Sequence, residues 1–162
     1  MNFKTLPVIC ILASGLLGSC GSDDDDTTTT PTEETTFKAV IAGSNWQATN
    51  QNTAVSGGIL GIHGEDNAGR KITITTDVVT KTGTYTSGSL AYELMHADGS
   101  VSRWTGFLKD STINVLTVTS FDATTKKIGG TFKFSGAKVF GATSEPDTVK
   151  VTNGVFTGIK LP

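Results

Sequence analysis

Short apolar stretches alternate with polar residues along most of this chain, and turn-forming pairs separate them. In residues 37–41, Phe, Ala and Ile occupy every second position. A period of two places the apolar side chains on one face of a β-strand. Asp98-Gly99 and Asn153-Gly154 are two of the separators. Such pairs readily adopt the positive φ angles of two-residue hairpin turns. Since no window has a period of 3.6 residues, the sequence predicts an all-β fold.

Consecutive hairpins account for most of the predicted strands. A first strand covers 37–41 and a short one includes Tyr85. The predicted pairs are 59–63 with 71–76, 91–96 with 101–108, 113–121 with 128–134, and 149–152 with 155–159. We therefore expect a single antiparallel domain of about nine or ten strands. Closure into a β-sandwich or a flattened barrel would remove exposed edges, and a lipocalin-like barrel is the rival.

The N-terminal segment has the organisation of a secretory leader. Lys4 is the only charged residue before Asp23, and residues 6–17 are largely apolar. This stretch is too short to span a bilayer, which takes about 20 residues. The following Gly18-Ser19-Cys20 resembles a bacterial lipobox, which implies that the leader is removed and that Cys20 is lipidated. Stable anchoring takes more than one acyl chain.

An acidic, threonine-rich segment follows the lipidation site. It has no large apolar residue up to Thr36, so it is predicted to be a disordered linker. The predicted organisation is a signal peptide at 1–19, the lipidated cysteine with its linker at 20–35, and an all-β domain at 36–162. Aspartates just behind the cysteine resemble the surface-export signal of Bacteroidota lipoproteins. That resemblance implies an outer-membrane anchor with the domain facing the cell exterior, and a periplasmic face is the alternative.

Several spacings extend this resemblance into the domain. The opening segment reads Phe-x-Ala at 37–39 and Gly-x-x-Trp-x-Ala at 43–48, and the closing segment reads Asn-Gly-x-Phe at 153–156. Together they resemble a family of Bacteroidota lipoproteins of uncharacterised function. The resemblance supports the fold and the location, and it brings no catalytic residues.

Two histidine clusters are the best candidates for metal or acid–base chemistry. His63 precedes Glu65 and Asp66, and His96 precedes Asp98. They would form a zinc site only if the two strand ends met. Residues of these types are also common in hairpin turns, which is the reading we favour. Without a catalytic motif, the sequence predicts neither an enzyme nor a cofactor nor a metal site.

The charge balance gives no sign of a nucleic-acid partner. The chain carries 13 basic and 15 acidic residues, and its net charge at pH 7 is −2. Six of the acidic residues belong to the linker, which leaves the domain slightly positive without a basic cluster in the sequence.

Aromatic residues are the better lead to a binding site. We predict ligand contacts for Trp104, Tyr92 and Arg103, because exposed aromatic rings can stack on sugars. The register of 101–108 allows two arrangements. Trp104 faces outward if Val101 and Phe107 are core residues, and inward if it shares the core with Leu108. Trp46 is expected in the core.

Three functions are consistent with the sequence. The first is a membrane-tethered, non-enzymatic binding or accessory module for a glycan or a protein. The second is a lipocalin-like carrier, with an internal cavity lined by Leu116, Phe132 and Phe134. The third is an anchored hydrolase, which requires acidic or histidine side chains to converge in one cleft.

Overall fold

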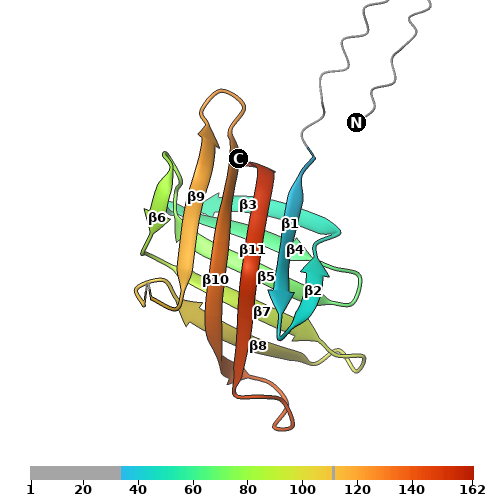
Figure 1. Cartoon of the computed structure of the whole chain (residues 1–162). Coiled ribbons are helices and arrows are strands. Elements are labelled where there is room, and N and C mark those ends of the chain that lie inside the picture. Colours follow the sequence, from blue (N-terminus) through green and yellow to red (C-terminus); the bar gives the residue numbers. More distant parts are fainter. Residues whose placement is uncertain (1–33, 111) are drawn as a thin grey trace, which may run out of the picture. The chain divides into compact units, whose positions relative to one another are not determined.

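A computed structural model describes residues 34–110 and 112–162, and all the regular structure in these residues is β (Figure 1). No helix long and apolar enough to cross a membrane occurs in them. The eleven strands are β1 (Thr36–Ile41), β2 (Ser44–Gln47), β3 (Asn50–Ser56), β4 (Ile59–Glu65), β5 (Arg70–Asp77), β6 (Gly83–Tyr85), β7 (Ser89–Met95), β8 (Val101–Phe107), β9 (Val115–Asp122), β10 (Lys127–Phe140) and β11 (Thr148–Lys160). The predicted fold class, an all-β antiparallel domain, is confirmed.

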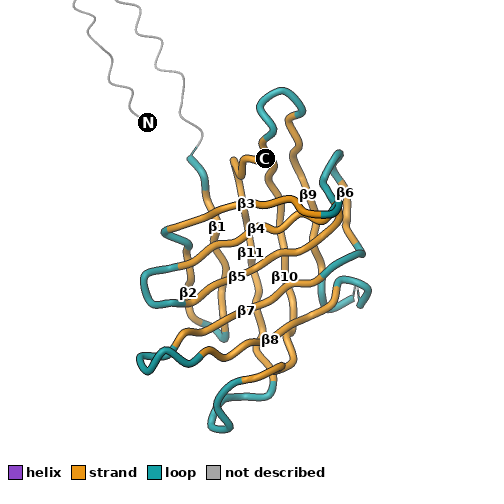
Figure 2. The backbone as a smooth tube through the Cα atoms, turned by 180° about the vertical axis from the view of Figure 1, so that it is seen from behind, coloured by secondary structure: helices purple, strands orange, loops and turns teal. Residues whose placement is uncertain are grey.

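The strands form one antiparallel sheet that curls into two layers. The hydrogen-bonded order is β2-β1-β11-β10-β8-β7-β5-β4-β3, and β9 joins β10 to β6. In Figures 1 and 2, β9, β10, β11, β1 and β2 form one layer and cross the other layer, which contains β3, β4, β5, β7 and β8. We call these the front layer and the back layer. The long strand β10 joins them, because it pairs with β9 and β11 in its first part and with β8 near its end.

Three of the four predicted hairpins are confirmed. They are β4–β5, β7–β8 and β9–β10. The β4–β5 turn shows why these hairpins could be predicted from the sequence. Asp66 Oδ1 accepts hydrogen bonds from the backbone N–H groups of Ala68 and Arg70, both at 2.9 Å, and Gly69 supplies a φ of 72°. A turn of this kind is encoded by its own side chains.

The fourth predicted hairpin is wrong. Asn153-Gly154 lies inside the continuous strand β11, where Asn153 has a φ of 51°. The register with β1 shifts at this point, from Lys38 opposite Val155 to Val40 opposite Thr152. The pair therefore forms a β-bulge, a second structure that uses positive φ. Both β1 and β10 pair with β11 before and after the bulge, so no hairpin forms at this point.

The edge strand β3 was not predicted. Its sequence, Asn-Gln-Asn-Thr-Ala-Val-Ser, has only two apolar residues, and most of its side chains are exposed. The prediction of consecutive hairpins also missed three long-range pairings, since β1 pairs with β11, β8 pairs with β10 and β6 pairs with β9. Pairings of this kind depend on tertiary packing and leave little local signal.

Aromatic side chains fill the space between the layers. Phe37 is fully buried, and its ring makes edge-to-face contacts with Trp46, Phe132 and Phe156 at centroid distances of 5.3, 5.5 and 6.4 Å. The prediction that Trp46 is a core residue is confirmed, and its Nε1–H donates to the carbonyl of Arg70 at 3.1 Å.

Candidate ligand-binding site

Two of the three predicted contact residues belong to the core. Trp104 is 1% exposed and Tyr92 is 6% exposed, and their rings stack at 5.4 Å with an interplanar angle of 22°. Trp104 Nε1–H donates to the carbonyl of Pro146 at 2.8 Å. Leu108 is buried and Phe107 is 56% exposed, so β8 adopts the register with Trp104 inward. Neither ring offers a face on which a sugar could stack.

Arg103 is separated from these rings, because alternate residues of a strand face opposite sides. Its guanidinium forms an ion pair with Glu93 at 3.0 Å, and Lys71 binds the other oxygen of the same carboxylate at 2.7 Å. These three residues occupy one row across β5, β7 and β8 on the outer side of the back layer. Arg103 is thus half-exposed and already paired.

His63 lies next to this row, on the outer side of β4. Its Nδ1 is 3.1 Å from Thr73 Oγ1 on β5, and its Nε2 is 3.0 Å from where a Cβ atom of Gly61 would be. A glycine therefore leaves room for the ring. Burial lowers the pKa of His63, and the charge of Lys71 lowers it further, while Glu93 acts in the opposite direction. At neutral pH the ring is uncharged and can both donate and accept a hydrogen bond.

An open hollow of about 560 Å³ lies beside His63. We call it the β3–β5 hollow, and it is lined by Asn50, Gln51, Asn52, Thr53, Ala54, His63, Glu65 and Lys71. The side chains of Asn50, Asn52 and Glu65 have no hydrogen-bond or ion-pair partner among the residues that the structure describes. Two amides, a carboxylate and the Nε2 of His63, whose Nδ1 already contacts Thr73, are thus available to a ligand. The sequence reasoning missed the amides, since they lie on the unpredicted strand β3.

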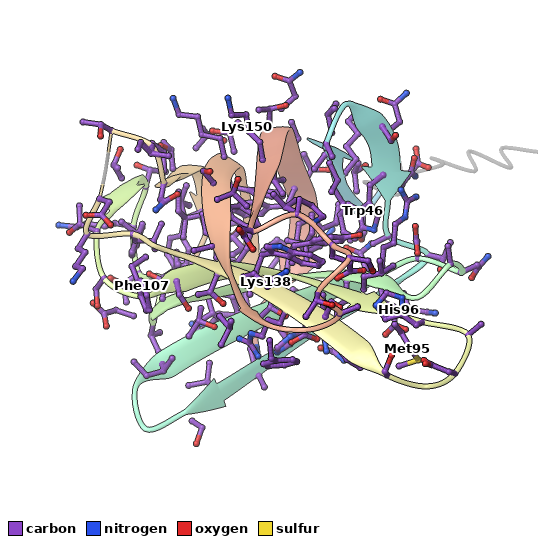
Figure 3. All side chains as sticks on the ribbon, turned by 90° about the horizontal axis from the view of Figure 1, so that it is seen from below. Trp46, Met95, His96, Phe107, Lys138 and Lys150 are labelled. Atoms are coloured by element: carbon purple, nitrogen blue, oxygen red, sulfur yellow. The ribbon has the colours of Figure 1, made fainter. Side chains whose placement is uncertain are left out.

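His96 makes a contact that resembles part of a catalytic triad. Its Nε2 is 3.0 Å from Ser102 Oγ and 3.1 Å from Glu145 Oε1. A triad uses the two ring nitrogens for the two partners, whereas here a single nitrogen faces both. Ser102 is fully buried and its Oγ also accepts the Ala142 N–H at 3.3 Å. These contacts therefore hold the β10–β11 loop against β8 and against His96, which is labelled in the view from below in Figure 3.

The turns that contain parts of the two histidine clusters are neighbours, because the Met95 N–H donates to the carbonyl of Gly69 at 3.0 Å. His63 lies within β4, and His96 follows β7. Across residues 34–110 and 112–162, no group of three or more His, Cys, Asp or Glu side chains could hold a metal ion. Asp98 acts as a turn residue, because its Oδ1 accepts the backbone N–H of Ser100 at 2.9 Å.

Cys20, the predicted lipidation site, lies outside the described residues, as do the leader and most of the predicted linker. No curated protein and no solved structure matches the chain. A family model described as "Domain of unknown function (DUF6252)" matches residues 33–160, which include all eleven strands. The chain therefore belongs to this family of unknown function.

Proposed function

We propose that this protein is a non-enzymatic binding module that is tethered by a lipid on Cys20 and binds a glycan in the β3–β5 hollow. The observation that carries the proposal is the set of unpartnered polar groups around that hollow. Sugar hydroxyls both donate and accept hydrogen bonds. The amides of Asn50 and Asn52 and the carboxylate of Glu65 offer complementary groups at an open surface.

The packed interior favours a surface site over an internal one. The residues that would line a carrier's cavity, Leu116, Phe132 and Phe134, are at most 3% exposed and belong to the core cluster. The geometry around His96 also gives little support to a hydrolase, because the neighbouring serine hydroxyl is buried.

The lipid anchor and the outward location rest on the leader and the aspartates behind Cys20. In this proposal the lipid holds the module at the outer membrane with its domain facing the exterior. We expect labelled palmitate to be incorporated in cells by the natural chain and not by Cys20→Ser. Proteolysis of the domain in intact cells would place it outside, and protection until lysis would place it in the periplasm.

Glycan binding can be tested with one substitution in the hollow and a matched one elsewhere. The purified protein is titrated with neutral oligosaccharides while the His63 ring protons are followed by NMR. We expect a saturable shift. Asn52→Ala should weaken binding by about two- to tenfold, the value of one lost hydrogen bond. Asn45→Ala, an exposed asparagine on β2, should leave the affinity unchanged.

Two results would contradict the proposal. One is the absence of any shift with the whole panel of neutral glycans. The other is an equal loss of affinity in Asn45→Ala and Asn52→Ala, which would place the ligand elsewhere on the surface.

A further inference from the structure

The charged residues are distributed unevenly between the two layers. Strands β1, β10 and β11 contain six lysines and no aspartate or glutamate. They lie side by side in the order β1-β11-β10. The back-layer strands instead have a balanced set: Glu65, Arg70, Lys71, Asp77, Glu93 and Arg103. Folding thus assembles a basic surface that is not contiguous in the sequence.

Three of these lysines define what we call the lysine face. Lys38, Lys133 and Lys150 are exposed, while the residues on either side of each are buried, so all three extend from the outer side of the front layer. Lys150 is labelled on that side in Figure 3. None of their three ammonium groups has an ion-pair or hydrogen-bond partner within the described part of the chain. The cations of the back layer are paired: Lys71 and Arg103 with Glu93, and Arg70 with Asp66.

Two open hollows accompany these lysines. One, of about 300 Å³, is bordered by Lys133, Lys150 and Thr152. The other, of about 480 Å³, is bordered by Lys38 and by polar residues that include Gln47 and Asn153. Each hollow therefore combines an unneutralised ammonium group with hydroxyl or amide groups.

We propose that the lysine face binds an acidic polysaccharide, whose carboxylate, sulfate or phosphate groups pair with Lys38, Lys133 and Lys150. Unpaired cations gathered on one surface attract a polyanion, and clustering strengthens the attraction. The hydroxyl and amide groups in the hollows suit the sugar backbone. A lipid surface fits less well, because insertion needs several large exposed apolar side chains, and Ile113 is the one such residue among those that border the two hollows.

The test uses the full chain and immobilised polygalacturonate, with neutral dextran as the uncharged reference. We expect binding to polygalacturonate that is progressively lost as NaCl rises from 0.05 to 0.5 M, which shortens the Debye length from about 14 to about 4 Å. Binding of dextran in the β3–β5 hollow would be insensitive to salt. The double substitution Lys133→Gln/Lys150→Gln should weaken binding by about tenfold or more at the lowest salt concentration.

The matched control removes two positive charges elsewhere. Lys81 and Lys109 lie in loops outside the lysine face, so Lys81→Gln/Lys109→Gln should bind within about twofold of the natural chain. An equal loss in both double variants would show a net-charge effect and overturn the proposal. Dextran binding that falls equally in Lys133→Gln/Lys150→Gln would do the same.

Two further measurements separate this proposal from its alternatives. Binding that requires Lys133 and Lys150 but occurs only on vesicles of anionic lipid, or only on DNA, would replace the polysaccharide with that partner. Asn52→Ala should bind polygalacturonate normally, because it lies in the back layer. A failure of neutral-glycan binding in the β3–β5 hollow therefore leaves this test unaffected.

Discussion

The pKa of the His63 imidazole depends on the residues that surround the ring. It lies on the sheet beside Thr73, over the space left by Gly61. Burial of the ring lowers its pKa from the ordinary value of 6.5, and Lys71 adds to this effect. The folded protein therefore holds the proton less tightly than the unfolded chain does. This residue's contribution to stability is complete above pH 6.5 and is lost as the pH falls through the folded-state pKa.

We predict that the His63 ring titrates below 6.5 and that Lys71→Met raises its pKa. The substitution removes a positive charge that opposes protonation and leaves Glu93, which favours it. NMR titration of the ring protons measures both values. Lys109→Met provides a control in a distant loop, and we expect no change there. A midpoint at or above 6.5 in the natural chain would show that burial does not dominate.

Sequence alone left one residue-level question open, and packing answered it. Residues 101–108 have apolar side chains on both faces of the strand, so the sequence allows Trp104 to face either way. The structure selects the inward register because Tyr92 stacks on the indole and Pro146 accepts its N–H. Tyr92 lies opposite Trp104 on the neighbouring strand and Pro146 is distant in the sequence, so alternation within 101–108 alone was insufficient.

At the scale of the strand, β11 shows that one dipeptide signature is compatible with either a hairpin turn or a β-bulge. Asn153-Gly154 has the signature of a hairpin turn, yet it forms a bulge that both neighbouring strands accommodate. Gly154 has a second role, because a Cβ atom there would lie 2.6 Å from three atoms of the Phe132 ring. The absent side chain therefore makes room for an aromatic ring in the core.

We predict that Gly154→Ala lowers the free energy of unfolding by about 1–3 kcal/mol. The methyl group would force the buried ring of Phe132 to move, and Phe37 packs against that ring. Urea denaturation followed by circular dichroism measures the change. Asn153→Gly keeps the positive φ and adds no atoms, so its effect should stay within about 0.5 kcal/mol. A Gly154→Ala protein as stable as the natural one would contradict this packing.

The strands that the sequence predicts well share two features. Apolar and polar residues alternate along them, and the residues of the connecting turns favour the turn conformation. The hairpins β4–β5, β7–β8 and β9–β10 are of this kind. Strand β3 is different, because its side chains are mainly polar and its extended conformation depends on backbone pairing with β4. The candidate site was missed for the same reason, since Asn50 and Asn52 belong to that strand.

At the scale of the whole molecule, the two layers depend on one shared core. Phe37 comes from β1 in the front layer, and a Cβ atom on Gly64 of β4 in the back layer would lie 2.5 Å from its ring. The same ring contacts Trp46, Phe132 and Phe156. A substitution of Phe37 would therefore disturb the packing of both layers.

We predict that Phe37→Ala lowers the free energy of unfolding by about 3–5 kcal/mol and that the layers still unfold together. Tryptophan emission and far-ultraviolet circular dichroism should give coincident transitions. Phe107→Ala removes an equal number of atoms from a ring that is 56% exposed, so it should cost about 0.5 kcal/mol or less. Separate transitions for the two probes would show that the layers are independent.

The charge asymmetry between the layers also belongs to this scale. Lys38 is almost a hundred positions from Lys133, and neither has a charged neighbour that marks a cluster in the sequence. Only the strand order places β1, β11 and β10 together. A basic surface of this kind becomes visible when the pairing is known.

The pairing of β1 with β11 has a consequence for how the molecule is made. Thr36 of β1 lies opposite Thr157 of β11, so the backbone groups on this edge of β1 remain unpaired until β11 has been synthesised. Contacts that join distant parts of a chain slow folding. The β1–β11 pair cannot form until β11 has been synthesised, and until then this edge of β1 is open to pairing with other chains. Production of this protein therefore depends on protecting β1 from aggregation until β11 is available.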